Sequence, residues 1–346
     1  SKASSGVGTS WSTAYKTLKE ATIFSNNNTA VKEIRIAKGT YFPTINTNRD
    51  STFLISRGDI RLFGGYPSGG GTRNIVTNPT ILSGDIGTLG TQTDNSYHVM
   101  VIAGLDAGAD SVIIEGLNIR WGRADASNSV TFNGQSFPRS YGGGMAIKGN
   151  ANANKIVVKN SIISGNYASN NGAGINVEAT IPVFINCLFS GNYGDYGGGA
   201  FNNLSAHTKY INCTFAGNHD NHSGGAMRNS SSNPVITNCI MYGNDGGISG
   251  SASTITYSLV QGETDITNGN IIGTSNPLFV SPQSAGTVNI DGDYSLQLGS
   301  VCINKGNNSA LSGITTDLAG NIRVHNGQAE MGAYEFVFCP TVQTVY

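Results

Sequence analysis

The chain has 346 residues and a net charge of −1, and charged residues make up 12% of it, about half the usual share. Its 47 glycines are close to twice the ordinary number. The near-zero charge argues against nucleic acid or an anionic membrane as a partner, because both need basic clusters. No apolar run approaches the roughly 18 residues of a membrane span and no signal peptide is present, so we expect a mature or trimmed chain that is not membrane-embedded.

The N-terminal part predicts a cap followed by irregular coils. Apolar residues recur at spacings of three and four from 11 to 24, which predicts an amphipathic helix with Ser12 as its N-cap. We expect this helix to cover the open end of a solenoid core. Short β-type runs bounded by turn residues follow at 33–36, 52–55, 60–63, 80–82 and 99–102, so we expect irregular first coils over 33–122.

The run from Val112 to Gly122 is the first with the character of the repeat that dominates the centre of the chain. Gly122 and Gly165 are 43 residues apart, which exceeds the 26-residue period of that repeat by 17. We therefore expect a loop of about this size at 123–141. Connections of that length are functional or disordered.

Four copies of one pattern stand 26 residues apart, at 160–166, 186–192, 212–218 and 238–244. Each copy begins and ends with Asn and carries Gly before the final Asn. A repeat of this length, made of short β-type runs and Gly/Asn turns, indicates a solenoid in which each coil buries its apolar face against the next.

Columns of equivalent residues predict which side chains point inward. Two columns are apolar and one is small and neutral, and all three are expected inside: Ile163, Phe189, Phe215, Met241; Val158, Phe184, Tyr210, Ile236; and Ser161, Cys187, Cys213, Cys239.

Three further columns predict corners of the coil. The first Asn of each copy predicts a turn ladder in left-handed geometry, the Gly-Asn pairs a second corner, and small pairs such as Gly198-Gly199 a third. Three strands and three corners per coil indicate an all-β, single-stranded right-handed parallel β-helix, a pectate-lyase-like solenoid with coils roughly 4.8 Å apart. We expect regular rungs over 142–262.

The C-terminal part loses the period. We expect irregular coils over 263–337, with 1–337 forming a single domain because a solenoid extends as one array. Residues 338–346 contain Pro340 and predict a linker to a further C-terminal region.

The repeats resemble the polymorphic outer-membrane-protein type repeats of right-handed parallel β-helices in secreted surface proteins of Bacteroidetes-like bacteria. The ends of the chain are similar to the choice-of-anchor Q group, on the segments 11–21, 34–41, 62–66, 81–85, 317–323 and 331–335. The resemblance implies the β-helix fold and a secreted or bacterial cell-surface location. It does not name an activity, because a fold alone does not carry one.

The five cysteines lead to separate expectations. Parallel rather than convergent Cβ directions in the column of Cys187, Cys213 and Cys239 favour buried thiols over a disulfide. A zinc site has no support from spacing. A bridge between Cys302 and Cys339 is left open.

Metal and enzyme chemistry have weaker signals than binding. We expect no cofactor, although Asp291 and Asp293 leave calcium open in a loop too short for an EF-hand. A polysaccharide lyase or glycoside hydrolase acting on a uronate polysaccharide is an alternative, since lyase chemistry needs a base beside a group that neutralises the carboxylate. Its candidate residues are Arg120, Arg123, Lys148, Lys159, Asp195, His219, Asp220, His222 and Arg228.

The strongest surface signal is aromatic. Tyr167, Tyr193 and His219 follow the second Asn ladder one period apart, and Tyr196 and His222 form a second pair. Such rings either stack on each other to stabilise the corner or form a contact strip for a glycan or a protein. We expect secreted or cell-surface adhesion or recognition by a strip of Tyr167, Tyr193, Asp195, Tyr196, His219, His222 and Arg228, with a structural spacer as a further alternative.

Overall fold

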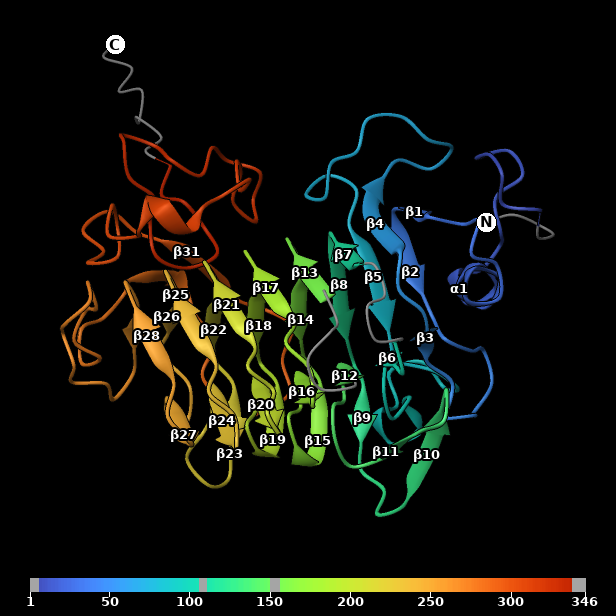
Figure 1. Cartoon of the computed structure of the whole chain (residues 1–346), viewed down its shortest axis with the longest axis horizontal. Coiled ribbons are helices and arrows are strands. Elements are labelled where there is room, and N and C mark those ends of the chain that lie inside the picture. Colours follow the sequence, from blue (N-terminus) through green and yellow to red (C-terminus); the bar gives the residue numbers. More distant parts are fainter. Residues whose placement is uncertain (1–5, 106–110, 150–155, 338–346) are drawn as a thin grey trace, which may run out of the picture.

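Residues one period apart are hydrogen-bonded neighbours in parallel strands throughout the repeat. The computed structural model describes residues 6–105, 111–149 and 156–337. There the strands stack into three long parallel sheets, which form the parallel β-helix expected from the sequence (Figure 1). No helix in the described ranges is long and apolar enough to cross a membrane.

Each long sheet takes one strand from each coil. The first sheet contains β1 (Glu33–Ala37), β4 (Ile60–Tyr66), β7 (Val112–Glu115), β13 (Ile156–Lys159), β17 (Val183–Ile185), β21 (Lys209–Ile211), β25 (Val235–Thr237) and β28 (Thr254–Thr256). The second contains β2 (Gly39–Tyr41), β5 (Thr80–Ser83), β8 (Leu117–Arg120), β14 (Ile162–Ser164), β18 (Leu188–Ser190), β22 (Thr214–Ala216), β26 (Ile240–Met241) and β29 (Leu259–Val260). The third contains β3 (Phe53–Ile55), β6 (Met100–Ala103), β12 (Met145–Lys148), β16 (Ile175–Glu178), β20 (Ala200–Asn203), β24 (Met227–Ser230) and β27 (Ile248–Gly250).

A fourth, short parallel sheet replaces one of the corners expected from the sequence. It contains β9 (Arg123–Ala124), β15 (Tyr167–Asn171), β19 (Tyr193–Tyr196) and β23 (His219–Asp220). The coils in the middle of the solenoid therefore have a fourth strand, where the sequence predicted three. These strands line its lower edge in Figure 1, directly after the second Asn ladder.

The predicted interior columns are confirmed. Phe189 pairs in register with Ile163 and Phe215, and Phe184 pairs with Val158 and Tyr210. All of these side chains are fully buried. The core is thus a set of like side chains stacked along the axis, with the rings of Phe189 and Phe215 nearly parallel at 4.3 Å.

The three cysteines of the repeat also point inward as expected. Cys187, Cys213 and Cys239 are fully buried free thiols. Burial raises the pKa of Cys213 and Cys239 well above the ordinary thiol value. Cys302 is buried too, but Cys339 lies outside the described residues, so the bridge between them stays a prediction.

The second Asn of each copy lies inside the solenoid and forms a continuous ladder. Asn166 donates from Nδ2 to Asn192 Oδ1 at 3.0 Å, Asn192 to Asn218 at 3.0 Å, and Asn218 to Asn244 at 2.9 Å. The remaining amide hydrogens reach carbonyls of neighbouring coils, as from Asn192 to Ile163 at 2.9 Å. The buried polar groups of this corner are therefore satisfied by each other.

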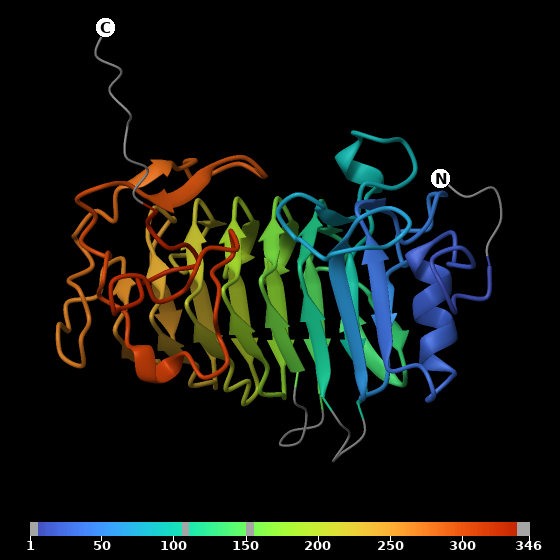
Figure 2. The ribbon, with the colours of Figure 1, turned by 90° about the horizontal axis from the view of Figure 1, so that it is seen from above.

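The first Asn of each copy forms an outer ladder in left-handed geometry, as predicted, with φ between 49° and 55°. Asn186 Nδ2 donates to Asn160 Oδ1 at 3.0 Å and also to the carbonyl of Thr316 at 2.7 Å. Asn212 donates to the carbonyl of Glu330 at 3.1 Å. Ile271 still pairs in parallel with Leu259 of the last coil. From Phe279 on, the C-terminal segment leaves the coils and runs back along the outer ladder, so the expectation of irregular coils over 263–337 is wrong for most of that range (Figure 2).

This returning segment builds a second hydrophobic core on the outer face of the second sheet. Leu188, Ala216 and Ile240 of the sheet are buried there against Phe279, Leu296, Cys302, Leu318, Met331 and Ala333. The segment contains a hairpin of β30 (Phe279–Ser281) and β31 (Asp293–Leu296) and the 3₁₀ turn η2 (Asn308–Ala310). The apolar side chains on the outer face of the repeat are therefore covered by a C-terminal segment whose own sequence is not repetitive.

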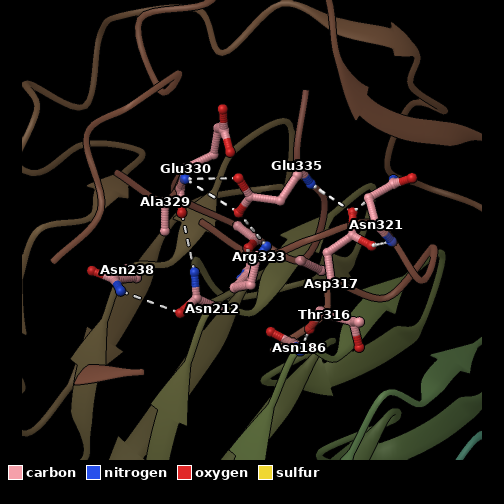
Figure 3. A network of polar contacts seen from close by, with 12 residues as sticks. Asn186, Asn212, Asn238, Thr316, Asp317, Asn321, Arg323, Ala329, Glu330 and Glu335 are labelled. Atoms are coloured by element: carbon pink, nitrogen blue, oxygen red, sulfur yellow. Dashed lines mark hydrogen bonds and ion pairs between the residues drawn. The ribbon is translucent and has the colours of Figure 1, made fainter. Parts of the chain in front are cut away.

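A buried polar network closes the segment, and we name residues 307–335 the clasp. Arg323 is fully buried and pairs with Glu335 at 2.8 Å, while Asp317 accepts the backbone N–H of Glu335 at 2.7 Å (Figure 3). Burial lowers the pKa of Arg323 to about 10 and raises that of Glu330 to about 7. The two closing segments that carry the family resemblance, 317–323 and 331–335, thus fold against each other.

The capping helix is shorter than predicted. Helix α1 spans Leu18–Asn26, and its N-cap is Thr17, not Ser12. Thr17 and Glu20 form a capping box, which fixes the first turn at this point. Upstream, the Ser10 and Thr13 side chains bond to nearby backbone groups, and such contacts compete with helix formation. The helix still lies over the end of the first coils, as expected (Figures 1 and 2).

The expected loop at 123–141 begins with β9 and continues as a hairpin. Its strands are β10 (Ser129–Phe132) and β11 (Gln135–Pro138), and Phe137 is buried against the third sheet. Arg123 pairs with Tyr167, so the true separation is 44 residues and the register inferred from Gly122 is wrong by one. Trp121, not Gly122, lies level with Gly165.

Candidate functional site

The short fourth sheet places the predicted aromatic residues in one column. Tyr167 pairs with Tyr193, Tyr193 pairs with His219, and Arg123 precedes them in the same column. Their side chains are half-buried, so each has one side against the solenoid and one toward solvent. We name the surface formed by Arg123, Tyr167, Tyr193, Asp195, Tyr196, His219, Asn221, His222, Arg228 and Asp245 the polar ladder.

The rings of the polar ladder stack along the solenoid axis. Tyr167 and Tyr193 have ring centroids 5.6 Å apart at an interplanar angle of 21°, and Tyr193 and His219 are 4.1 Å apart. The guanidinium of Arg123 lies 4.3 Å from the Tyr167 ring centroid. Both faces of Tyr167 and of Tyr193 are therefore occupied by neighbours, and their ring edges are what can reach solvent.

Hydrogen bonds connect these edges into a network. One His219 nitrogen contacts the Asp245 carboxylate, and the other contacts Asn221 Oδ1 at 2.9 Å. The same Asn221 oxygen accepts from the Tyr193 hydroxyl at 3.4 Å, while Asn221 Nδ2 donates to Asp195. Asn221 thus links two neighbouring coils at the surface.

A second ring pair continues the network toward the third sheet. Tyr196 and His222 stack at 4.2 Å and 18°, and the Arg228 guanidinium lies 4.4 Å from the Tyr196 ring centroid. His222 Nδ1 contacts the Asp195 carbonyl at 2.9 Å. All seven residues predicted from the sequence are therefore joined by direct contacts into one surface.

Two members of this surface were not predicted from the sequence. Asn221 and Asp245 carry the hydrogen bonds that connect the rings, yet neither is aromatic nor recurs in a column of like residues. Their spacing from Asp195 and His219 is 26 residues in each case, so the repeat period is the signal that could have identified them.

Asp220 has a structural role instead. It is 5% exposed, and its carboxylate accepts the backbone N–H groups of Gly197, His222 and Ser223. These bonds hold the turn that positions His222 on the surface. Asp220 is therefore not available as a base.

The basic residues considered for lyase chemistry do not converge. Arg123 pairs with Asp125 at 2.8 Å, Lys148 with Glu178 at 2.7 Å, and Lys159 with Glu115 at 3.0 Å, and they lie on the fourth, third and first sheets. Arg120 lies on the second sheet, where burial lowers its pKa and its buried Nε has no hydrogen-bond partner.

Among the described residues no group of three or more His, Cys, Asp or Glu side chains converges as a metal site would require. Asp291 and Asp293 are both exposed, and Asp293 Oδ1 already accepts the Ser295 amide at 2.9 Å. Calcium at this loop stays an untested prediction.

The three stacked parallel sheets define the molecule as a parallel β-helix protein. No protein-family model matches its sequence, and no curated protein matches it. Among solved structures it is similar to the pectate lyase Pel9A, at 13% identity and a TM-score of 0.35, over 95% of this chain and 93% of that chain.

Proposed function

We propose that this protein is a secreted or bacterial cell-surface recognition module that binds a polysaccharide along the polar ladder. The observation that carries the proposal is the connected array of ring edges on adjacent coils. Coils repeat about every 4.8 Å, close to the length of one sugar unit in an extended chain. A linear polymer can therefore meet equivalent groups at successive units.

The chemistry of the ladder favours hydroxyl-rich ligands. Tyrosine hydroxyls, imidazole nitrogens, an amide and carboxylates offer both donors and acceptors, which is what sugar hydroxyls require. The ladder carries two arginines, Arg123 and Arg228, and two aspartates, Asp195 and Asp245, so its formal charges balance with the histidines neutral. A neutral or weakly charged glycan therefore suits this face better than a strong polyanion, and a polar protein surface is the other partner it could accept.

Binding through this surface is expected to be weak for a short glycan. Exposed hydrogen bonds exchange with water and contribute little each, so we expect micromolar or weaker affinity. Several copies on one surface would raise the apparent affinity through effective concentration. Such behaviour fits display in many copies on a cell surface.

The test is a glycan array followed by titration calorimetry with the hits. Tyr193→Phe combined with Tyr196→Phe keeps both ring stacks and removes the hydroxyls, and Asn221→Ala removes the link between coils. Both are expected to weaken binding with little change in melting temperature. Lys209→Ala, an exposed change on the first sheet, is the matched control.

A more drastic variant tests recognition and stability together. Tyr193→Ala combined with Tyr196→Ala removes the rings themselves. Lost binding with unchanged melting supports the recognition surface, whereas unchanged binding, or a large fall in melting temperature, assigns these rings to stabilising the corner. An array with no hits, with the fold intact, favours the spacer.

A polysaccharide lyase is the second candidate, and Arg120 is the observation that favours it. Its guanidinium makes no ion pair within the described ranges, so it is available to neutralise the carboxylate of a uronate unit. Incubation with uronate polysaccharides, followed by ultraviolet absorbance of unsaturated products, tests this activity. Product formed by the wild type and lost in Arg120→Ala would support the enzyme.

A further inference from the structure

Trp121 occupies a corner where the later coils have glycine. The pairing of β8 with β14 puts it level with Gly165, and Gly191 and Gly217 follow one coil apart. Trp121 has φ 63°, close to the 62°, 59° and 66° of these glycines. A bulky L residue in this region is strained where glycine is not. The strain is tolerated here, which points to a use for the side chain itself.

The indole of Trp121 is not used for packing between rings. In the part of the chain that the structure describes, it makes no ring stack, cation–π contact or hydrogen bond, and the residue is half-buried. Trp11, by contrast, lies against the Tyr66 ring at 5.4 Å. The Trp121 backbone is nevertheless held firmly, because its carbonyl accepts Asn95 Nδ2 at 2.8 Å and its N–H donates to Gly165.

A small notch lined in part by Trp121 lies next to the first members of the polar ladder. Its volume is about 10 Å³, and it is lined by Gln92, Asn95, Trp121, Arg123, Tyr167 and Val288, among others. Asn95 is 3% exposed, and its Oδ1 has no hydrogen-bond partner among the residues that the structure describes. A buried acceptor without a partner is unfavourable, and a hydroxyl at the notch would satisfy it. Arg123 and Tyr167 are the first two members of the ladder column.

We propose that Trp121 is the platform of a sugar-binding subsite at the N-terminal end of the polar ladder. One pyranose ring lies with its apolar face over the indole and directs a hydroxyl toward Asn95, and the following units continue along Tyr167 and Tyr193. The notch has room for about one water, so the sugar lies over it and not within it.

This inference rests on the proposed glycan-binding function and supplies what the ladder lacks. The faces of Tyr167 and Tyr193 are occupied by their neighbours, so they cannot stack on a sugar. Stacking on an exposed aromatic face is a main source of affinity for the apolar side of a pyranose. Within the described residues, neither another ring nor a guanidinium stacks on Trp121, in contrast to Tyr167 and Tyr193.

Tryptophan fluorescence tests the contact directly. The chain has two tryptophans, so Trp11→Phe leaves Trp121 as the only reporter. The probes are cellohexaose, xylohexaose, mannohexaose and hexagalacturonate. We expect at least one of them to shift the Trp121 emission and to protect it from acrylamide quenching. Unchanged emission and quenching with all four overturn the proposal.

A second variant separates binding from packing. Trp121→Gly removes the strain and the platform together, so it should raise the melting temperature while weakening the responding saccharide about tenfold in calorimetry. Trp121→Phe should retain part of the affinity. Unchanged affinity in Trp121→Gly overturns the subsite, and a lower melting temperature assigns the ring to packing and overturns it as well.

The same titrations keep this subsite distinct from the ladder as a whole. If Tyr193→Phe with Tyr196→Phe abolishes binding and Trp121→Gly does not, the subsite is wrong and the proposed function stands. If only Trp121→Gly abolishes binding, the subsite stands and the ladder is not the continuation of the site.

Discussion

Replacing Glu330 by Gln tests how the clasp responds to pH. Glu330 is 2% exposed, and its Oε2 has no hydrogen-bond partner. Burial raises its pKa from the ordinary 4.5 to about 7, although the charge of Arg323 acts in the opposite direction and that of Asp317 adds to the rise. The folded state therefore prefers the protonated carboxyl. The contribution of protonated Glu330 to the free energy of unfolding is fully present below pH 4.5 and is lost as pH rises through about 7.

The size of this effect follows from the two pKa values. Their difference is about 7 − 4.5, or about 2.5 pH units, and each unit corresponds to about 1.4 kcal/mol. The folded protein should therefore lose on the order of 3 kcal/mol through this group between acid and mildly alkaline pH. Glu330→Gln keeps the shape and cannot ionise. It should match the wild type near pH 4 and exceed its stability by up to about 3 kcal/mol near pH 8.

Urea unfolding at about pH 4, 6 and 8 measures the global effect. Hydrogen exchange of the Gly332 amide, which donates to the Asn238 carbonyl at 2.7 Å, measures opening of the clasp alone. The control is Glu335→Gln, which weakens the buried pair with Arg323 and should destabilise by about 3 kcal/mol or more at each pH. Parallel pH profiles for Glu330→Gln and the wild type would refute the reasoning.

Three further predictions concern the core. Phe189→Ala should lower the free energy of unfolding by about 3–5 kcal/mol, and Phe24→Ala, at a ring 43% exposed, by far less; equal effects in urea would contradict the assigned register. The three cysteines of the repeat should react with a thiol reagent only after unfolding, because burial closes them to solvent, and fast native labelling would place that column outside. Asn192→Ala should lower stability by about 2–4 kcal/mol in thermal melts, since it breaks four buried hydrogen bonds, and an unchanged melting temperature would argue against the inner ladder.

The repeat made much of the fold predictable. Four copies in register define columns, and a column that is apolar in each copy must lie inside, because one exposed position would break the alternation along the strand. This argument placed Phe184, Phe189 and the cysteines correctly. It also placed the predicted aromatic residues next to each other, since residues one period apart are neighbours whatever their identity.

The remaining features depend on contacts that have no period. The clasp binds the outer Asn ladder through backbone carbonyls such as those of Thr316 and Glu330, and backbone groups leave no trace in the sequence. The position of Trp121 was misassigned because Gly122 was aligned with Gly165. Aligning the apolar column instead, Ile119 with Ile163, places Trp121 at the glycine corner.

In the proposed function the side chains of the polar ladder both bind a ligand and stabilise the solenoid, and this decides which experiments can separate binding from stability. Each ring packs on the ring of the next coil, so removing one ring also removes a contact that stabilises the fold. Removing a hydroxyl or a bridging amide changes the edge that faces solvent and leaves the stack in place. Tyr193→Phe and Asn221→Ala therefore report on recognition, whereas Tyr193→Ala reports on recognition and stability together. Trp121 is the exception, because its indole stacks on no other ring in the described part of the chain and its backbone is strained. Its removal should therefore weaken binding and raise the melting temperature.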